Sequence, residues 1–401
     1  MDNQAEIEEF LTRGVAKIYP SKEFLKAKLE KREKLSMYLG IDPTGPTLHI
    51  GHAVPILKLR QFQKLGHKVI LLIGDFTGMI GDPTDKTAAR KRLTRKEVLQ
   101  NAKSYKKQIS SIISFTGDNP AELRYNSKWL KTLSLSEAFD LFANVTYTQT
   151  IKRDMFQKRI EAGNELYLHE FLYPVIQGYD SVALDIDGEV GGNDQTFNML
   201  VGRDLLKKLK NKEKFVITMK LLEDANGKKM GKTEGNMVPL TEKPDAMFGK
   251  IMSWADGLII PAFELCTALP FAELAKVKVD LESGTNPRDL KLKLASEIVS
   301  LYYGEGKASK ARVAFLATFS KKEMPTDIKE FKAERGAMLS DCLLSSGTIS
   351  SKTEWRRLAG ENAVGKVSED GSVEKISDFN FKVEVTAVFK IGKHRFLKVV
   401  V

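Results

Sequence analysis

Cysteine is scarce in this chain: Cys266 and Cys342 are the only two among its 401 residues. They lie far apart and belong to no Cys-x-x-Cys pair, so the sequence indicates no zinc site and no metal held tightly by protein side chains. We expect both thiols to be small buried groups of a protein that works in a reducing compartment, the cytoplasm.

Long apolar runs are also missing. The longest uninterrupted ones, such as residues 69–73, have the length of a strand, whereas a membrane-spanning helix needs about 20 apolar residues. Residues 1–4 include an acidic side chain and do not read as a secretion signal. We therefore expect no membrane span. With 42% hydrophobic residues, the chain is long enough for two or three domains with well-packed cores.

Acidic residues are sparse where basic residues gather. The net charge is +11, and between positions 86 and 107 only Glu97 opposes a set of basic side chains. That set consists of Lys86, Arg90, Lys91, Arg92, Arg95, Lys96, Lys103, Lys106 and Lys107. A second basic run consists of Lys207, Lys208, Lys210, Lys212 and Lys214. Such clusters suit a phosphate backbone, so we expect a nucleic-acid partner whose binding weakens as salt rises.

The segment 48–52 places the imidazoles of His49 and His52 around Gly51, where a predicted strand gives way to a predicted helix. The start of a helix presents unpaired N–H groups and a positive dipole, and both favour a triphosphate. Gly51 has no side chain, so a base or ribose can approach the backbone closely. Taken alone, this pattern could also be an ordinary surface turn.

A second segment, about 180 residues later, gathers cations among glycines. Lys229 and Lys232 lie in a run of lysines and glycines at 227–235. Mobile lysines suit a pyrophosphate leaving group, whose charge grows in the transition state. Taken alone, such a loop could be a solvated hairpin. The order and spacing of the two segments favour one shared nucleotide site.

Together the two segments resemble the HIGH and KMSKS motifs of class I aminoacyl-tRNA synthetases. Further blocks in the same order resemble the bacterial tyrosyl-tRNA synthetases, at 38–44, 78–83, 173–180 and 191–195. The chain departs from the family pattern at two places. The second motif has Gly231 and Thr233 in place of serines, a variant that the family also has. Lys220 occupies a position where the family pattern leads us to expect proline.

The order of predicted elements indicates an α/β fold. Apolar strands at 37–42 and 68–74 flank a helix at 53–65, as in a nucleotide-binding unit with a parallel sheet covered on both faces. The other predicted elements are helices at 5–35, an inserted helical stretch at 94–164, strands at 181–185 and 215–219, and a helix at 194–209.

The pattern changes twice toward the C-terminus. It is mainly helical from 244 to 319, and after a linker at 321–325 two short helices precede alternating strands. Helices followed by strands, with basic residues on the second helix, resemble the RNA-binding module of the ribosomal protein S-four type. We expect a Rossmann-like catalytic domain at 1–240, an α-helical anticodon-binding domain at 241–325 and a small α+β RNA-binding domain at 335–401.

The resemblance implies a tyrosine–tRNA ligase. Such an enzyme activates L-tyrosine with ATP, releases pyrophosphate and transfers tyrosine to the 3′ end of tRNA(Tyr). Activation needs positioned donors and cations rather than a protein nucleophile. The resemblance assigns catalytic roles to Thr44, His49, His52, Lys229 and Lys232. It assigns contacts with ATP, which would carry Mg²⁺ as its counterion, to Asp42, Gly51, Gly192, Asp194, Lys232 and Thr233.

The resemblance also implies a pocket for tyrosine. Tyr38 and Asp180 would hydrogen-bond the phenol hydroxyl. The ammonium and carboxylate groups of the amino acid would be held by Asp82, Tyr173, Gln177 and Gln195. A buried site that pairs with a hydroxyl rejects an analogue without one, because its own polar groups are then left unpaired.

Three alternatives stay open from the sequence. The first is a tryptophan–tRNA ligase, which shares the fold and both motifs. The second is a small cytidylyl- or adenylyltransferase, although such enzymes are usually shorter. The third is an RNA-binding protein on the same scaffold that has lost catalysis. The resemblance further implies a homodimer with contacts from the region between the two motifs.

Overall fold

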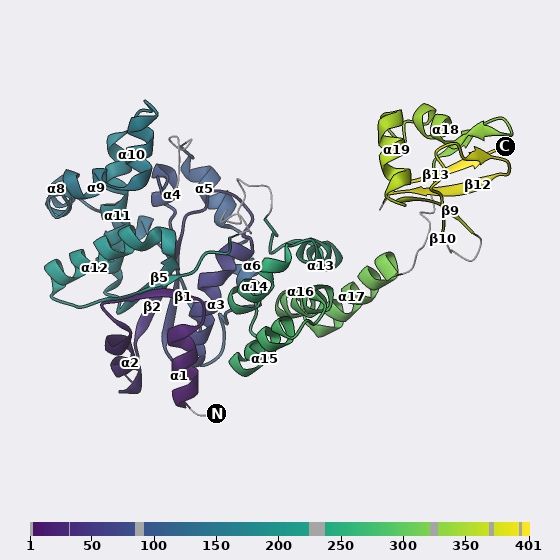
Figure 1. Ribbon diagram of the computed structural model, residues 1–401. Helices are drawn as coiled ribbons and strands as arrows, with labels where there is room; N and C mark the ends of the chain where they lie inside the picture. Colours follow the sequence, from purple (N-terminus) through teal and green to yellow (C-terminus); the bar gives the residue numbers. More distant parts are fainter. Residues whose placement is uncertain are drawn as a thin grey trace. The chain divides into compact units, whose positions relative to one another are not determined.

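The computed structural model describes residues 3–31, 33–84, 92–223, 237–320, 328–368, 373–392 and 395–401. The chain falls into two compact units, Met1–Arg312 and Val313–Val401 (Figure 1). The first unit contains a six-stranded sheet, and the second contains a five-stranded sheet. No helix in the described ranges has both the length and the apolar character needed to cross a membrane.

The first sheet has the strand order β1-β6-β5-β2-β3-β4. Its parallel strands are β2 (Ser36–Ile41), β3 (Lys68–Ile73), β4 (Glu122–Tyr125), β5 (Gly188–Gly192) and β6 (Phe215–Met219). The edge strand β1 (Val15–Tyr19) runs antiparallel to β6. The chain adds β3 and β4 on one side of β2 and later adds β5 and β6 on the other, so the strand order reverses between β2 and β5. The predicted α/β class is confirmed.

Helices cover the parallel strands. α3 (Ile50–Lys64) packs against β2, β3 and β5, and α12 (Thr196–Lys210) packs against β5 and β6. Figure 1 shows the strands between these two helices. α11 (Leu168–Leu184) lies along α12, where Gly178 faces Gly202. A Cβ atom on Gly178 would lie 3.1 Å from the Gly202 Cα atom, so glycine permits this close approach.

One predicted strand, at 181–185, is wrong. Residues up to Leu184 belong to α11, and Asp185 ends that helix in the left-handed conformation with φ of 49°. The strand follows as β5, in which Gly188, Gly191 and Gly192 are three of the five residues. Glycine is unfavourable in strands, so β5 carries little sequence signal, and a short apolar run before it cannot be told from a helix end by periodicity.

Two short strands lie inside stretches for which the sequence predicts only helices. β1 lies between α1 (Asn3–Thr12) and α2 (Lys22–Glu30), and β4 lies within 94–164. Both have mostly exposed or half-buried residues and lack the apolar run of a central strand. The helices of that stretch are α5 (Arg95–Ala102), α6 (Tyr105–Ile109), α7 (Ser127–Leu130), α8 (Leu135–Phe142), α9 (Tyr147–Ile151) and α10 (Asp154–Glu161).

Residues 244–320 are mainly helical, as the pattern predicts. Its helices are α13 (Pro244–Met252), α14 (Ile259–Cys266), α15 (Phe271–Glu282), α16 (Pro287–Tyr303) and α17 (Glu305–Ser320). Arg13 fastens the N-terminal segment to the end of α14, because its guanidinium donates to the carbonyl groups of Phe263, Glu264 and Thr267 at 3.1, 2.9 and 2.8 Å. The domain boundaries at 240 and 325 stay predictions.

The second unit has a sheet of order β10-β9-β12-β13-β7. Its strands are β7 (Glu330–Lys332), β9 (Val364–Val367), β10 (Val373–Lys375), β12 (Ala387–Ile391) and β13 (Arg395–Val400), and β8 (Ala337–Met338) pairs separately with β11 (Lys382–Val383). α18 (Leu339–Ser345) and α19 (Lys352–Gly360) supply Leu343 and Trp355 to a core that also contains Phe389 and Leu397. Both cysteines of the chain are free and buried, as predicted.

Candidate active site

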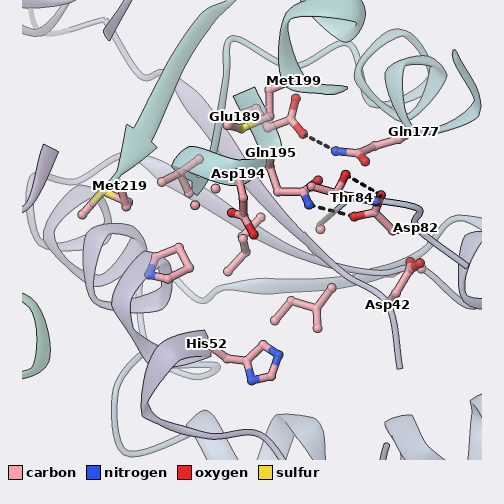
Figure 2. A pocket seen from close by; sticks show the side chains of 18 of the residues that line it. Asp42, His52, Asp82, Thr84, Gln177, Glu189, Asp194, Gln195, Met199 and Met219 are labelled. Carbon is pink, nitrogen blue, oxygen red and sulfur yellow. Dashed lines mark hydrogen bonds between the residues drawn. The ribbon is translucent and has the colours of Figure 1, made fainter. Parts of the chain in front are cut away.

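The carboxyl ends of the parallel strands border a cavity of about 610 Å³. Asp42 follows β2, Asn126 follows β4 and Gly192 ends β5, and all three residues line the cavity. In an open parallel sheet, ligands bind at this position, outside the strand ends where the order reverses. Figure 2 shows His52 at one side of the cavity and Gln177 with Glu189 at the other.

The cavity gathers residues that the sequence predicts for tyrosine and ATP. Those in the described part of the chain all line it: Tyr38, Asp42, Thr44, His49, Gly51, His52, Asp82, Tyr173, Gln177, Asp180, Gly192, Asp194 and Gln195. Lys229, Lys232 and Thr233 lie outside the described residues. The fold thus brings separate sequence blocks to one site, while their individual roles stay predictions.

The two imidazoles cap α3 themselves. The Nδ1 atom of His49 accepts a hydrogen bond from the Gly51 N–H at 3.1 Å, and Nδ1 of His52 accepts from the His49 N–H at 3.2 Å. The Ile50 N–H donates to the Val238 carbonyl at 3.0 Å. The prediction that this helix start presents unpaired N–H groups to a triphosphate is therefore wrong. It presents imidazoles instead, and each in its neutral form carries its proton on Nε2.

The described ends of the segment that carries the lysines both lie at this site. Leu222, on the N-terminal side, lines the cavity. Beyond residues 224–236, which lie outside the described part of the chain, the backbone pairs with the histidine segment. The Leu240 N–H donates to the Leu48 carbonyl at 2.8 Å. The chain that follows residues 224–236 is therefore joined to the histidine segment through the backbone.

Lys220, which stands where proline is expected, makes two contacts that proline lacks. Its N–H donates to the Gly14 carbonyl at 2.8 Å, and its Nζ atom lies 3.0 Å from Oε1 of Glu264 on α14. Burial alone would raise the pKa of Glu264, but the hydrogen bonds from Lys220 and Gly14 hold it below its ordinary value. The entry to the lysine segment is thereby attached to β1 and α14.

The two basic clusters differ in structure. In the first, Lys86, Arg90 and Lys91 lie outside the described residues, whereas its remaining members from Arg92 to Lys107 are exposed. In the second, Lys212 pairs with Asp187 at 2.9 Å, and Lys214 has no exposed surface. The prediction that Lys214 belongs to a phosphate-facing patch is wrong.

The inner end of the cavity holds a buried carboxyl group. Asp180 is 3% exposed, and it accepts hydrogen bonds from Trp129 Nε1 at 2.8 Å and Asn126 Nδ2 at 3.3 Å. Removal from water raises the pKa of Asp180 well above its ordinary value, despite both donors. The pKa of Tyr38 is also raised by burial, and by the charges of Glu189 and Asp180. Sequence reasoning missed Asn126 and Trp129, which follow the unrecognised strand β4.

Asp42 fixes the hydroxyl group of Tyr173. The Tyr173 hydroxyl donates to Oδ2 of Asp42 at 2.8 Å, and Thr77 Oγ1 donates to Oδ1 at 2.6 Å. Gly74 makes room for this carboxylate, because a Cβ atom there would lie 1.9 Å from Asp42 Oδ1. Since its proton is committed to Asp42, the Tyr173 oxygen is an acceptor toward the cavity, which suits an ammonium group.

A series of hydrogen-bonded amide side chains lies along the cavity wall, and Figure 2 shows its two end pairs, Gln195 with Asp82 and Gln177 with Glu189. Gln195 Nε2 donates to Oδ2 of Asp82 at 2.7 Å. Asn198 Nδ2 lies 3.1 Å from Oε1 of both Gln195 and Gln177, and Gln177 Nε2 donates to Glu189 Oε1 at 3.4 Å. Sequence reasoning missed Asn198 and Glu189. This series orients the amides, so each carbonyl and N–H group has a defined direction at the wall.

Metal-binding groups are absent from the described ranges. Nowhere in them do three or more His, Cys, Asp or Glu side chains come together in a way that could hold a metal ion.

Asp194 lies beside Gly192, where a Cβ atom would come within 2.3 Å of the Asp194 carboxylate. Glycine at this position therefore leaves room for the acid.

The reversed strand order and the cavity at the strand ends fit the class I aminoacyl-tRNA synthetase fold that the sequence resemblance implies, and the comparison with known families shows that class. The family described as tRNA synthetases class I (W and Y) matches residues 30–320. The chain is 43% identical over 393 residues to the tyrosine–tRNA ligase of Haemophilus ducreyi, with 98% of this chain and 97% of that protein covered. It belongs to the family of bacterial tyrosine–tRNA ligases.

Two further proteins illustrate the extent of the likeness. The tyrosine–tRNA ligase of Carboxydothermus hydrogenoformans is 42% identical over 408 residues, covering 98% of this chain and 97% of that protein. A C-terminally truncated mitochondrial tyrosyl-tRNA synthetase of Aspergillus nidulans superposes with a TM-score of 0.67 at 23% identity, covering 79% of this chain and 94% of that one. The second likeness concerns the fold alone.

Proposed function

We propose that this protein activates L-tyrosine with ATP to tyrosyl-adenylate and pyrophosphate, and then transfers tyrosine to the 3′ end of tRNA(Tyr). The observation that carries the proposal is that Tyr38 and Asp180, both buried, line the same cavity as His49 and His52. The names of the similar proteins support tyrosine over tryptophan as the amino acid.

The inner part of the cavity suits tyrosine. The Asp180 carboxylate would accept a hydrogen bond from the phenol hydroxyl, and Tyr38 would pair with the same hydroxyl. Asp82, Tyr173 and Gln177 would hold the ammonium group with acceptor oxygens, and Gln195 would approach the carboxylate. A tryptophan side chain has no hydroxyl at this depth, so its binding would leave the buried Asp180 with its two protein donors and without the donor that tyrosine supplies.

The outer part of the cavity suits ATP. Thr44, His49 and His52 would donate to phosphate and ribose oxygens, beside Gly51. The ribose and adenine would lie near Asp42, Gly192 and Asp194. Lys229, Lys232 and Thr233 are proposed to bind the phosphates from their own segment. Mg²⁺ would arrive with ATP as its counterion, held chiefly by phosphate oxygens, as this cation commonly is in nucleotide sites.

Activation then requires only positioning and charge stabilisation. The tyrosine carboxylate attacks the α-phosphorus atom of ATP. The bond from this atom to the oxygen that bridges to the β-phosphate breaks, and pyrophosphate leaves. Negative charge moves onto pyrophosphate, where the Nε2–H group of His49 and the lysines would stabilise it more strongly than in the bound substrate. In the second step, a terminal ribose hydroxyl of tRNA attacks the tyrosyl carbonyl and AMP leaves.

ATP–pyrophosphate exchange with purified protein tests this function, with tyrosine, tryptophan and phenylalanine supplied in separate reactions. We expect kcat/KM for tyrosine to exceed the values for tryptophan and phenylalanine by orders of magnitude. Exchange driven best by tryptophan would keep the fold assignment and overturn the substrate. If none of the three supports exchange while the folded protein still binds tRNA, the RNA-binding alternative replaces the ligase.

A second copy of the chain is proposed to cover an apolar patch on the inserted helices, which we call the α8–α11 patch. Its members are Leu135 (74% exposed), Phe139 (64%), Tyr147 (68%), Ile160 (49%) and Leu168 (82%). Exposed apolar patches on monomers are usually small, and a larger one marks an interaction site. The patch lies between the two motifs, where the family resemblance implies the dimer contact.

Replacing Leu135 and Leu168 together by aspartate should convert the dimer to a monomer. Burying each leucine contributes about 1.5–3 kcal/mol, so losing both and adding two charges should raise the dissociation constant by at least about a hundredfold. Sedimentation velocity at micromolar concentration measures this. Val279→Asp on α15 is the matched control, because Val279 is an exposed apolar residue (59%) outside the patch. A monomeric wild type would contradict the proposal.

A further inference from the structure

A lysine is buried directly behind the proposed tyrosine pocket. Lys214, which precedes β6, has no exposed surface, and its Nζ atom lies 5.9 Å from the centre of the Tyr38 ring. It donates a hydrogen bond to Glu189 Oε2 and another, of 2.8 Å, to Ser181 Oγ. A buried ammonium group is costly unless it is paired, so both contacts are needed to hold it there.

Glycine makes the space for this amine. A Cβ atom on Gly202 would lie 2.9 Å from Lys214 Nζ and 2.8 Å from Ser181 Oγ. Any larger residue at this point of α12 would press on both groups. The position of Lys214 therefore depends on α11, α12, β5 and the start of β6. Close packing of these elements holds its amine in one place.

The lysine fixes the direction of the hydrogen bonds that lead to the pocket. Because an ammonium group only donates, Ser181 Oγ is the acceptor toward Lys214. The Ser181 hydroxyl lies 3.0 Å from the Tyr38 hydroxyl, where its own proton can be donated. Tyr38 then accepts from Ser181 and keeps its own proton for another partner. Glu189, on the neighbouring strand, accepts from Lys214 and Gln177, and it also accepts from the Tyr38 hydroxyl. Tyr38 is therefore already a donor, and the substrate phenol oxygen would replace Glu189 as its acceptor.

We propose that Lys214 and Ser181 are positioning residues that make Tyr38 a hydrogen-bond donor to the phenol oxygen of the substrate. The inference rests on the proposed tyrosine site. The substrate hydroxyl then accepts from Tyr38 and donates to Asp180, so each of its hydrogen-bonding capacities is used once. A cation at the start of such a chain polarises every bond along it. Substrate selection thus depends on two residues that do not touch the substrate.

Ser181→Ala interrupts the chain and keeps the Lys214–Glu189 pair. We expect kcat/KM for tyrosine in exchange to fall about fivefold, the size of one net hydrogen bond, with kcat/KM for phenylalanine unchanged. In a Tyr38→Phe background, Ser181→Ala should change the tyrosine value less than about twofold, since Ser181 acts only through Tyr38. Equal losses for both amino acids, or an equal loss in both backgrounds, overturn the proposal.

A second variant removes the cation without leaving a buried charge. Lys214→Met combined with Glu189→Gln should lower the ratio of tyrosine to phenylalanine kcat/KM by a similar factor, and an unchanged ratio overturns the role of Lys214. Thr218→Val is the control, because it removes a buried hydroxyl that donates to the Lys17 carbonyl at 3.2 Å and does not contact Tyr38. Exchange by the wild type tests the proposed function separately: its absence overturns both inferences, whereas an unchanged variant ratio overturns only this one.

Discussion

Replacing His49 by asparagine should lower the rate of tyrosyl-adenylate formation by about a hundredfold or more and leave the protein as stable as the wild type. The imidazole caps α3 through Nδ1, which accepts from the Gly51 N–H. Asparagine is among the best residues at a helix N-cap, so it can take over that bond. Its short amide cannot present a donor where Nε2–H does. Tyrosine affinity should not change, because the amino acid binds in the inner part of the cavity.

His49→Ala separates the two roles of the imidazole. Alanine removes both the cap and the donor, so it should lose the same rate and also about 1 kcal/mol of unfolding free energy. Single-turnover formation of adenylate and thermal denaturation measure the two quantities for each variant. If the asparagine variant retains the wild-type rate, the imidazole serves only to cap the helix, and charge stabilisation at the phosphates must come from other residues.

Much of the fold and of the cavity lining was predictable, because the signals are local. Strands β2, β3 and β6 are apolar runs buried on both faces, and their prediction is confirmed. The polar residues that follow such strands collect at one edge of a parallel sheet, whatever the distance between them in sequence. Asp42 and Asp194 therefore meet in one cavity.

The remaining features depend on long-range packing. Lys214 reads as one member of an exposed basic run, yet it is buried, because Glu189 on β5 and the space beside Gly202 on α12 accommodate its amine. No local pattern connects these positions. Trp129 likewise reads as an ordinary apolar residue of a helical insertion, and its role beside Asp180 depends on β4, a strand too short and polar to recognise.

The prediction of unpaired N–H groups at the start of α3 failed for a different reason. A helix start presents unpaired donors only if no side chain or neighbouring strand reaches them. Here His49 and His52 fold back onto the backbone, and the chain near Val238 supplies a carbonyl. The residue types at the motif were sufficient to locate the site, but they were not sufficient to tell which of its donors face the ligand.

Replacing Asp180 by asparagine should lower kcat/KM for tyrosine by about ten- to a hundredfold and leave phenylalanine use unchanged or improved. A hydrogen bond to a charged acceptor contributes roughly 1.5–3 kcal/mol, and the substrate phenol would lose that acceptor. Phenylalanine binding deprives the carboxylate of the substrate donor in the wild type, and a neutral amide reduces this penalty. Pyrophosphate exchange with both amino acids measures the ratio.

Stability should change little in the same variant, because two effects offset each other. Burial raises the pKa of Asp180. At any pH above the ordinary carboxyl pKa of about 3.9, ionisation of this buried group therefore opposes folding. Asparagine cannot ionise and removes that cost. Against this, asparagine has one oxygen where two accepted from Trp129 and Asn126, so one donor loses its acceptor. We expect the unfolding free energy at neutral pH to stay within about 2 kcal/mol of the wild type.

The matched control for this charge loss is Asp185→Asn, five positions further along the chain. Asp185 ends α11 in the left-handed conformation, which asparagine adopts readily, and its side chain is 59% exposed. Activity and discrimination should therefore stay at wild-type values in the control. Wild-type discrimination in Asp180→Asn would contradict the assignment of the phenol site. A loss shared equally by both amino acids would instead assign Asp180 a structural role, because a group that pairs with the substrate hydroxyl must affect tyrosine more than phenylalanine.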